Sequence, residues 1–411
     1  MKNRIQASII TIGDELLIGQ TIDTNSAWLA KELNSIGITV KRRVSVGDNK
    51  QEIISALDQE SKIAQVIFIT GGLGPTSDDI TKPLLCEYFG GKLIVNEIAR
   101  ENIIDIFSRR LNRPLIERNL KQAEVPDNCI VIQNTRGTAP GMWFEKNDVI
   151  FISMPGVPHE MKGMMELDIL PALKNKYSLQ PIQHRTLLTA GIGESFLAEK
   201  LADFEAQLPC SIKMAYLPNY GMVRIRLTTA DEKAPIDKQF FNLKELVKEF
   251  LVIDRDLTIQ ETIASILLNN KKTVSVAESC TGGYISHLLT SIPGSSGFFW
   301  GSVIAYDNRV KKNILNVEQK TLEKFGAVSM ETVIEMARGV KNATGTDYAL
   351  ATSGIMGPGG GTDQKPVGTV YIACATPAGI ESTSFQFRFD RKRNIELTAA
   401  HALDFLRKNM G

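Results

Sequence analysis

The chain has 411 residues, of which 43% are hydrophobic and 23% are charged, and its formal net charge is +1. This length suggests two or three domains, and this composition is that of an ordinary folded protein. The small net charge excludes a protein that binds nucleic acid or a membrane surface through an overall positive charge.

The apolar runs are strand-length, as at 66–70 and 149–154, and none approaches the ~20 residues of a membrane helix. The first residues pass directly into a predicted strand with no small-residue cleavage site, so we expect no signal peptide. The five cysteines are widely spaced and form no Cys-x-x-Cys pair, which argues against a zinc site or a disulfide framework. We therefore expect a cytoplasmic protein.

Strand and helix signals alternate along the first region, residues 1–172. We predict strands at 7–12 and 66–70, and a helix at 25–36 that ends at Gly37. Apolar segments at 142–144 and 149–154 flank Lys146-Asn147-Asp148, which is typical of a hairpin turn. Such alternation predicts a mostly parallel sheet with helices on both faces.

Two further regions follow without a long linker, at 178–255 and 258–411. The middle region is predicted to be a small α+β domain with strands at 186–189, 211–216 and 222–228 and helices at 195–204 and 239–251. The last region returns to an α/β pattern, with predicted strands at 273–277, 302–306, 348–353 and 369–375 and a closing helix at 395–408. The sequence thus predicts three closely docked domains.

A serine motif lies where the strand 273–277 passes into a predicted helix at 284–289; it reads Ala-Glu-Ser-Cys-Thr-Gly-Gly from 277 to 283. Ser279 is then near a helix N-terminus, where unpaired N–H groups and the helix dipole favour negative charge. Glycines at 282 and 283 allow a ligand close to the backbone. This pattern suits a nucleophile with its own oxyanion donors. The alternative is a serine N-cap on a phosphate-binding loop without covalent chemistry.

A serine nucleophile needs a base. The chain has four histidines, and His287 falls two turns into the following helix, so a Ser-His-Asp triad is poorly supported. Lys311 follows the strand 302–306 and would share the carboxyl edge of the sheet with Ser279. An ordinary lysine is neutral in only about one molecule in a few thousand at pH 7, so burial or a second cation must lower its pKa. The alternatives are a solvated helix lysine at 311 and Cys280 as nucleophile.

Two more segments follow strands in the last region. A glycine-rich stretch at 353–362 favours either a flexible hairpin or backbone donors around a ribose or phosphate; it is not a Walker loop. Arg391 opens the closing helix and would suit a phosphate clamp, although an arginine at that place is also an ordinary surface residue.

Four segments of this region resemble, in order and spacing, the C-terminal CinA domain, the nicotinamide mononucleotide deamidase family: the serine motif, Tyr-Asp-Asn-Arg-Val-Lys at 306–311, the glycine-rich stretch, and Lys-Pro-Val-Gly-Thr-Val at 365–370. The resemblance covers 258–411. It implies Ser279 as nucleophile, Lys311 as its base and no metal. It implies a substrate site made by Thr281, Gly282, Gly283, Tyr306, Asn308, Ser353, Gly354 and Arg391. The chain departs from the family at Met356, where a small residue is common, and at Phe389, where glycine usually precedes Asp-Arg.

Acidic or glycine-rich segments also follow strands in the first region, at 13–17, 71–79 and 154–160. Exposed backbone N–H groups together with carboxylates suit a pyrophosphate with a hard divalent ion. The alternative is that the acids at 78 and 79 simply complement a helix dipole.

These segments, with Asp-Thr-Asn at 23–25 and Gly-Thr-Ala-Pro-Gly at 137–141, resemble the N-terminal CinA domain, which has a molybdopterin-binding-like, three-layer αβα fold. The resemblance implies an ADP-ribose pyrophosphatase that forms AMP and ribose 5-phosphate with Mg²⁺, Mn²⁺ or Co²⁺, helped by potassium. It implies nucleotide contacts from Gly13, Asn25, Gly71, Gly72, Gly74, Thr76, Pro155 and Gly156. It implies Asp14, Asp78 and Asp79 as metal ligands or water-activating residues. A nucleotide- or pterin-binding module without hydrolysis is the alternative.

The middle region resembles the KH-like insert of the same family. Its turn is Gly191-Ile192-Gly193-Glu194, in which the acidic Glu194 would face a nucleic-acid phosphate and repel it. We therefore expect a structural connector rather than a nucleic-acid site. Together the three regions predict a bifunctional hydrolase of pyridine-nucleotide salvage that acts on nicotinamide mononucleotide and ADP-ribose, forms a homodimer, and binds neither nucleic acid nor membrane. The rival hypothesis is a non-catalytic binding protein that acts as a competence or DNA-damage partner.

Overall fold

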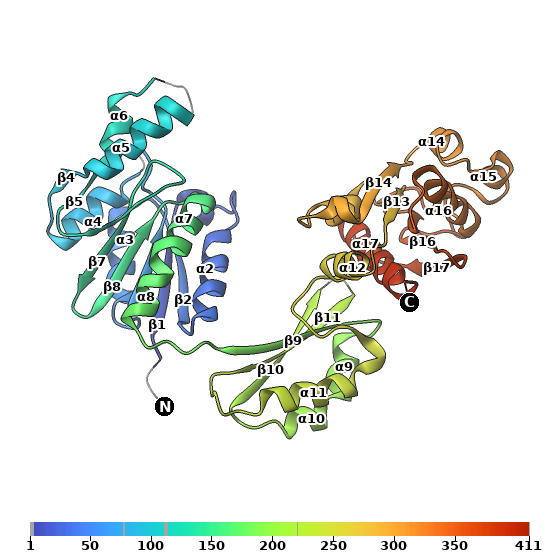
Figure 1. Cartoon of the computed structure of the whole chain (residues 1–411), viewed down its shortest axis with the longest axis horizontal. Helices are drawn as coiled ribbons and strands as arrows, with labels where there is room; N and C mark the ends of the chain where they lie inside the picture. Colours follow the sequence, from blue (N-terminus) through green and yellow to red (C-terminus); the bar gives the residue numbers. More distant parts are fainter. Residues whose placement is uncertain (1–3, 77–78, 111–113, 220, 411) are drawn as a thin grey trace. The chain divides into compact units, whose positions relative to one another are not determined.

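The computed structural model describes residues 4–76, 79–110, 114–219 and 221–410, and it divides into two compact units, Met1–Ile182 and Gln183–Gly411 (Figure 1). Asp78, one of the predicted metal ligands, lies outside the described residues. The predicted boundary between the middle and last regions falls inside the second unit.

The first unit is built on a six-stranded sheet in the order β2-β1-β3-β8-β7-β6. Four of its strands are parallel: β1 (Gln6–Ile12), β2 (Thr39–Val46), β3 (Val66–Thr70) and β8 (Val149–Met154). Two are antiparallel: β7 (Gly141–Lys146) and β6 (Ile130–Ile132). Asn147 and Asp148 form the β7–β8 turn with φ values of 52° and 62°, which confirms the predicted hairpin.

Helices cover both faces of this sheet, because alternate side chains of its strands enter opposite buried clusters. Ala7 and Ile9 of β1 belong to one cluster, and Ile10 and Ile12 belong to the other. The helices are α1 (Asp14–Leu17), α2 (Thr24–Ser35), α3 (Lys50–Glu60), α4 (Thr81–Phe89), α7 (Pro158–Met164), η3 (Met165–Ile169) and α8 (Leu170–Lys176). A small lobe holds β4 (Leu93–Val95), α5 (Glu97–Asp105), η1 (Ile106–Arg110), α6 (Glu117–Leu120), η2 (Lys121–Ala123) and β5 (Glu124–Pro126).

The second unit begins with a four-stranded antiparallel sheet in the order β10-β11-β9-β12. Its elements are β9 (Gln183–Ala190), α9 (Glu194–Lys200), α10 (Ala202–Ala206), β10 (Ile212–Asn219), β11 (Met222–Thr229), α11 (Ile236–Leu246), η4 (Lys248–Phe250) and β12 (Leu251–Ile253). The prediction of one helix at 239–251 is wrong at its C-terminal end. The helix ends at Leu246, and the apolar, partly β-branched run at 251–253 pairs with β9 instead.

The rest of the second unit is a five-stranded sheet in the order β14-β13-β15-β16-β17. Its strands are β13 (Val274–Glu278), β14 (Phe299–Ile304), β15 (Tyr348–Gly354), β16 (Thr369–Ala375) and β17 (Ile380–Gln386). Its helices are α12 (Ile259–Asn269), α13 (Tyr284–Thr290), η5 (Ser295–Gly297), α14 (Asn308–Asn313), α15 (Gln319–Phe325), α16 (Met330–Thr344) and α17 (Arg391–Lys408). The predictions omitted β17 and α16.

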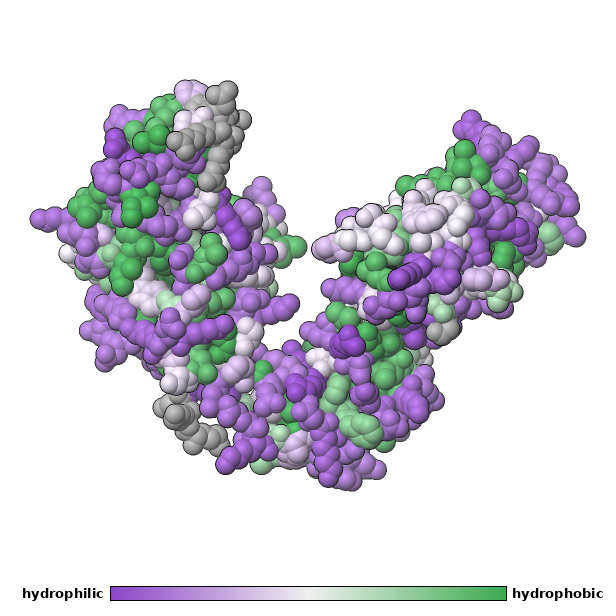
Figure 2. All heavy atoms as spheres, in the orientation of Figure 1, coloured by the Kyte–Doolittle hydropathy of each residue, from purple (hydrophilic) through white to green (hydrophobic). Residues whose placement is uncertain are grey.

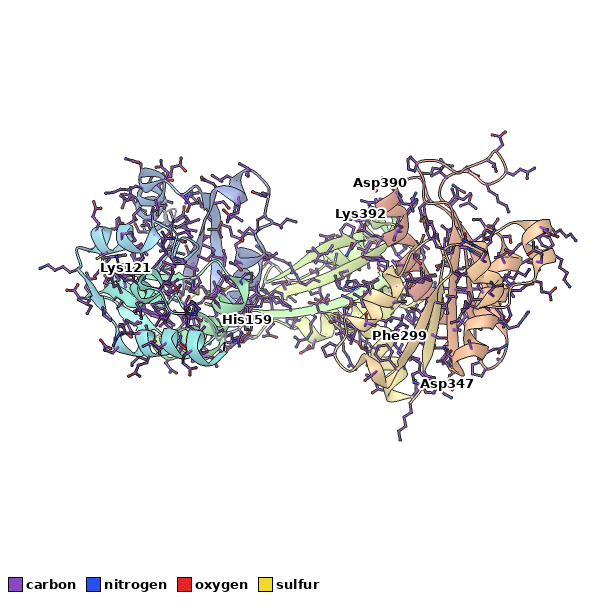
Figure 3. The ribbon with its side chains drawn as sticks, turned by 90° about the horizontal axis from the view of Figure 1, so that it is seen from above. Lys121, His159, Phe299, Asp347, Asp390 and Lys392 are labelled. Atoms are coloured by element: carbon purple, nitrogen blue, oxygen red, sulfur yellow. The ribbon has the colours of Figure 1, made fainter. Side chains whose placement is uncertain are left out.

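Strands β14, β13 and β15 are parallel, so their carboxyl ends share one edge of the sheet. Figure 3 shows Phe299 and Asp347 at the amino ends of β14 and β15, away from Asp390 and Lys392, which flank Arg391 at the start of α17. Ser279, Tyr306 and Arg391 therefore all belong to segments at the carboxyl edge, as predicted for a ligand site in such a sheet.

The middle region and the C-terminal sheet share one buried cluster. Leu188, Ala190 and Met222 of the antiparallel sheet pack in the same core as Ile263 of α12 and Leu397 of α17. Figure 2 shows apolar residues only as scattered patches among hydrophilic ones on the visible face, which is ordinary for a folded protein. The middle region thus contributes to the core that supports the C-terminal site.

Candidate active site

Ser279 lies in the turn that joins β13 to α13. Gly282 and Gly283 have φ values of 60° and 99°, a conformation that favours glycine, and they turn the chain into the helix. The fully buried Glu278 carboxylate accepts hydrogen bonds from the N–H groups of Gly283, Ile285 and Ser286 and from the Ser286 hydroxyl.

This role of Glu278 was not predicted, and it corrects one expectation. The first-turn N–H groups of α13 are not available to a ligand beside Ser279, because they donate hydrogen bonds to the carboxylate of Glu278. Within the part of the chain that the structure describes, no residue accepts a hydrogen bond from the N–H of Thr281 or Gly282. Those two N–H groups are donors available beside the serine.

Lys311 is 1% exposed and reaches Ser279 from α14. Its Nζ lies 3.1 Å from Ser279 Oγ, 2.6 Å from the carbonyl oxygen of Ala305 and 3.4 Å from that of Tyr306. The end of β14 is fixed to β13 because Ala305 N–H donates to Glu278 O at 2.7 Å. The structure therefore brings together the two residues predicted as nucleophile and base.

Burial lowers the pKa of Lys311, whereas the neighbouring Cys280 and Asp307 oppose that change when they carry negative charge. A neutral amine has two hydrogens and one lone pair. The two carbonyl oxygens accept the hydrogens, which leaves the lone pair for the Ser279 hydroxyl. The arrangement suits a base that takes the serine proton.

Cys280, the rival nucleophile, is 5% exposed. Burial raises the pKa of its thiol to about 12, so the reactive thiolate is disfavoured at neutral pH. Among the residues with described positions, no histidine makes a hydrogen bond with Ser279. These observations favour Ser279 with Lys311 over a cysteine or a histidine-based site.

Arg391, the first residue of α17, joins two other predicted site elements. Its Nη1 donates to the carbonyl oxygen of Gly357 in the glycine-rich loop at 2.8 Å, and its Nη2 donates to the Tyr306 hydroxyl at 3.0 Å. Tyr306 is 63% exposed, and its carbonyl oxygen faces Lys311. Asn308 is exposed at the first position of α14. Tyr306 and Arg391 thus form one rim beside the serine–lysine pair.

Three other predicted substrate residues make structural contacts. The Thr281 hydroxyl lies 2.9 Å from that of Thr352, and the fully buried Ser353 hydroxyl donates to Ala327 O at 2.7 Å. Gly354 continues β15 and pairs with Val370 of β16. Their contact with a substrate stays a prediction.

Two buried residues explain how the glycine-rich loop is held. The Met356 side chain enters the core, so the departure from the family at this position does not fill the site. Asn394 is fully buried, and its amide donates to the carbonyl oxygens of Met356 at 3.1 Å and Phe389 at 2.9 Å. Asn394 was not predicted, because an asparagine near a helix start carries no signal of a distant loop partner.

The carboxyl edge of the first unit brings several predicted nucleotide contacts together. Asn25 Nδ2 donates to Gly156 O at 2.7 Å and to Thr70 Oγ1 at 3.2 Å, and Thr70 Oγ1 donates to Pro155 O at 2.9 Å. A Cβ atom on Gly156 would lie 3.4 Å from Gly71 Cα, so these loops are in close contact. Gly71 and Gly72 have φ values of 115° and 65°. Gly13 is fixed to the neighbouring strand by its N–H, which donates to Val46 O at 3.1 Å.

Two of the predicted acids, Asp79 and Asp14, make local contacts. The Asp79 carboxylate accepts hydrogen bonds from the N–H groups of Gly74 and Thr76 and from the Thr76 hydroxyl. The Asp14 carboxylate accepts from the N–H of Asp48 at 3.1 Å. Searching only the described residues reveals no group of three or more His, Cys, Asp or Glu side chains placed to hold a metal ion. The metal-binding roles of Asp14 and Asp79 stay predictions.

Among the helices with described positions, none is both long and apolar enough to cross a bilayer.

Fold and site together define a mixed α/β protein in which a buried lysine contacts a partly buried serine, an arrangement in which a lysine can act as base for a serine nucleophile. Residues 8–175 match the family described as "Probable molybdopterin binding domain", residues 184–252 match "Damage-inducible protein CinA KH domain", and residues 256–410 match "CinA C-terminal domain".

A CinA-like protein of Cytophaga hutchinsonii is 42% identical to the chain, over 100% of this chain and 99% of that protein. A CinA-like protein of Flavobacterium psychrophilum is 43% identical over 99% of both. The chain belongs to the CinA-like family. The solved structure of competence/damage inducible protein CihA from Agrobacterium tumefaciens is 35% identical over 37% of this chain and 94% of that one, with a TM-score of 0.37.

These matches confirm the predicted family and fold class, with a molybdopterin-binding-like region, a CinA KH region and a CinA C-terminal region in this order. Membership of the CinA-like family is consistent with a hydrolase.

Proposed function

We propose that the C-terminal site deamidates nicotinamide mononucleotide to nicotinate mononucleotide and ammonia. The observation that carries the proposal is the buried Lys311 amine, 3.1 Å from Ser279 Oγ and with its pKa lowered by burial. A serine hydroxyl beside an uncharged amine is the minimum that acyl transfer from an amide requires.

In the first step Ser279 Oγ attacks the amide carbon while Lys311 Nζ takes the hydroxyl proton. The N–H groups of Thr281 and Gly282 would stabilise the oxyanion. Lys311 then returns the proton to the amide nitrogen, the carbon–nitrogen bond breaks, and ammonia leaves an acyl ester on Ser279. A water molecule then attacks the acyl carbon while Lys311 accepts its proton, and the bond between that carbon and Ser279 Oγ breaks. Lys311 returns the proton to Oγ, which restores the serine and releases the product acid.

In this proposal Tyr306 and Arg391 bind the phosphate of the substrate. Arg391 is held between Gly357 O and the Tyr306 hydroxyl, so its cation is fixed on the rim rather than free in solution. A fixed guanidinium favours a phosphate bidentately. We assign the glycines at 282, 283 and 354, with Asn308 and Ser353, to the surrounding substrate wall.

The test measures ammonia and nicotinate mononucleotide released from nicotinamide mononucleotide by the full-length protein. Ser279→Ala should abolish turnover, whereas Cys280→Ala should retain most of it. If the purified wild-type protein is inactive across a broad pH range, the non-catalytic binding hypothesis replaces this one. If Cys280→Ala alone is inactive and still folded, the nucleophile is the cysteine.

We also propose that the first unit cleaves ADP-ribose to AMP and ribose 5-phosphate. The convergence of Asn25, Gly71 and Gly156 at one sheet edge supports a nucleotide site there. The described carboxylates do not fit a metal site made by protein groups alone, since Asp79 is committed to the loop at 74–76. A divalent cation, helped by potassium, would bind the substrate's phosphates, with Asp14, Asp78 and Asp79 as its candidate protein ligands.

This second activity is tested by measuring AMP formed from ADP-ribose with added Mg²⁺, Mn²⁺ or Co²⁺. Asn25→Ala should lower AMP formation while the deamidase activity of the same preparation is unchanged. Binding of ADP-ribose without cleavage under all cation conditions would instead support a nucleotide-binding module. The proposed biological setting is a cytoplasmic homodimer in pyridine-nucleotide salvage.

A further inference from the structure

A cavity of about 180 Å³ lies within the second unit, between the β10–β11 hairpin and helices α12, α13 and α17. Its apolar walls include Leu188 and Met222 from the middle region and Ile259 and Leu288 from the C-terminal region. Pockets for drug-sized ligands have volumes of about 300–1,000 Å³, so this cavity suits a smaller molecule.

A loosely held guanidinium lines one part of this cavity. Arg224 Nε lies 3.5 Å from Asp256 Oδ1, and Nη2 lies 3.4 Å from Leu257 O. Both distances exceed the ~2.7–2.9 Å of a strong charge-assisted hydrogen bond, and the buried Nε has no hydrogen-bond partner. Thr258 and Ile259 at the start of α12 line the same part; the capping box of Thr258 and Glu261 already occupies the end of this helix, so Arg224 is the group that favours an anion there.

A carboxylate lines another part. Glu396 of α17 faces the cavity with Tyr284 of α13, and both burial and the charge of Glu396 raise the pKa of Tyr284. In the part of the chain that the structure describes, Glu396 forms no hydrogen bond or ion pair, and none joins it to Arg224. Two opposite charges thus line one small apolar cavity without neutralising each other.

We propose that this cavity binds a small amino acid with an apolar side chain in its zwitterionic form. The ligand's carboxylate contacts Arg224, its ammonium group contacts Glu396, and its side chain fills the space between Met222 and Leu288. A ligand with both charges contacts both partly desolvated groups, whereas a purely apolar ligand would leave Glu396 without a partner and Arg224 with only its long contacts to Asp256 and Leu257.

The experiment is isothermal titration calorimetry of the full-length protein with leucine and two analogues. 4-Methylpentanoate lacks the ammonium group, and isopentylamine lacks the carboxylate. Leucine should bind saturably at one site per chain, and each analogue should bind about tenfold more weakly or worse, because each loses one charge-assisted contact. Equal binding of leucine and either analogue overturns the proposal, as does the absence of leucine binding.

Variants locate the site. Arg224→Gln and Glu396→Gln should each weaken leucine binding about tenfold or more, while Arg226→Gln, two residues along β11 and outside the cavity, should not. Ala400→Leu, from α17, fills the cavity and should abolish leucine binding. This variant changes no charge, so it tests the site independently of the folding of the two charge variants. Leucine binding that survives Ala400→Leu places the ligand elsewhere and refutes the assignment. Ser279→Ala should bind leucine normally, so this result is separate from the deamidase test.

Discussion

Replacing Lys311 by methionine tests the proposed base directly. Methionine keeps the length and apolar stem of lysine but has no amine, so Ser279 loses the group 3.1 Å from its hydroxyl. General-base catalysis contributes about 10²–10⁴-fold to rate, and we expect kcat for deamidation to fall by that factor. Lys312→Met, which removes the next, exposed lysine on the same helix, should leave kcat unchanged.

The loss should not result from unfolding, because two effects on stability oppose each other. Methionine removes the cost of burying the amine, and replacing buried charged groups by apolar ones often gains about 1–4 kcal/mol. It also leaves the carbonyl oxygens of Ala305 and Tyr306 without this donor, which costs about 1–3 kcal/mol for each group left unpaired. We expect a small net change in the free energy of unfolding, measured by urea denaturation.

The pH dependence provides the sharper check. The pKa of Lys311 is below 10.5 in the folded protein, so the wild-type kcat should rise about tenfold per pH unit and level off below pH 10.5. Between its folded pKa and 10.5 the unfolded chain binds more protons, so wild-type stability rises with pH there. The stability of Lys311→Met relative to wild type should therefore be highest at neutral pH and decline toward pH 10.5. A variant that retains kcat, or a kcat profile independent of pH, refutes the reasoning.

Three further predictions concern neighbours of this pair. Asp307→Asn removes a charge that raises the pKa of Lys311, while asparagine still caps α14, so the rise of kcat with pH should move to lower pH. Iodoacetamide should alkylate the exposed Cys210 in the native protein but not Cys280, because burial raises the pKa of the Cys280 thiol to about 12. Mass spectrometry of the peptides measures the labelling, and rapid labelling of Cys280 would contradict the prediction. Glu278→Gln should lower the free energy of unfolding by about 1–3 kcal/mol and also lower kcat, because the amide –NH₂ meets N–H donors where an oxygen now accepts.

Strand and helix patterns predicted a sheet in each large region, whereas the pairing of Ser279 with Lys311 was predicted only through the resemblance to the C-terminal CinA domain. Strands at 66–70, 149–154 and 369–375 have the predicted bounds, since short apolar runs between turn residues have few other interpretations. The strand at 251–253 was missed because Leu251 continues the helical spacing of Leu243 and Val247, and only the pairing with β9 distinguishes the strand. Local periodicity cannot report such a partner, which is more than sixty residues away in sequence.

The residues of the site that were not predicted were missed for the same reason, because the local pattern of the sequence does not show their partners. Glu278 and Asn394 act through contacts with backbone groups that only the folded chain brings near, at Ser286 and Met356. A motif records which residue types occur together, and it does not record which buried polar group satisfies which other. The prediction therefore identified the serine–lysine pair, whose side chains lie 3.1 Å apart, but not the residues that hold it in place.

Glu278 also limits how the proposed oxyanion is stabilised. Because its carboxylate already occupies the first-turn N–H groups of α13, the dipole of that helix is locally offset by a negative charge. Stabilisation must then come from the N–H groups of Thr281 and Gly282 and from Lys311, which becomes cationic when it takes the serine proton. In the reactive form the lysine is neutral, so its positive charge arises only as the oxyanion forms. Differential stabilisation of this kind lowers the barrier without strengthening binding of the uncharged amide.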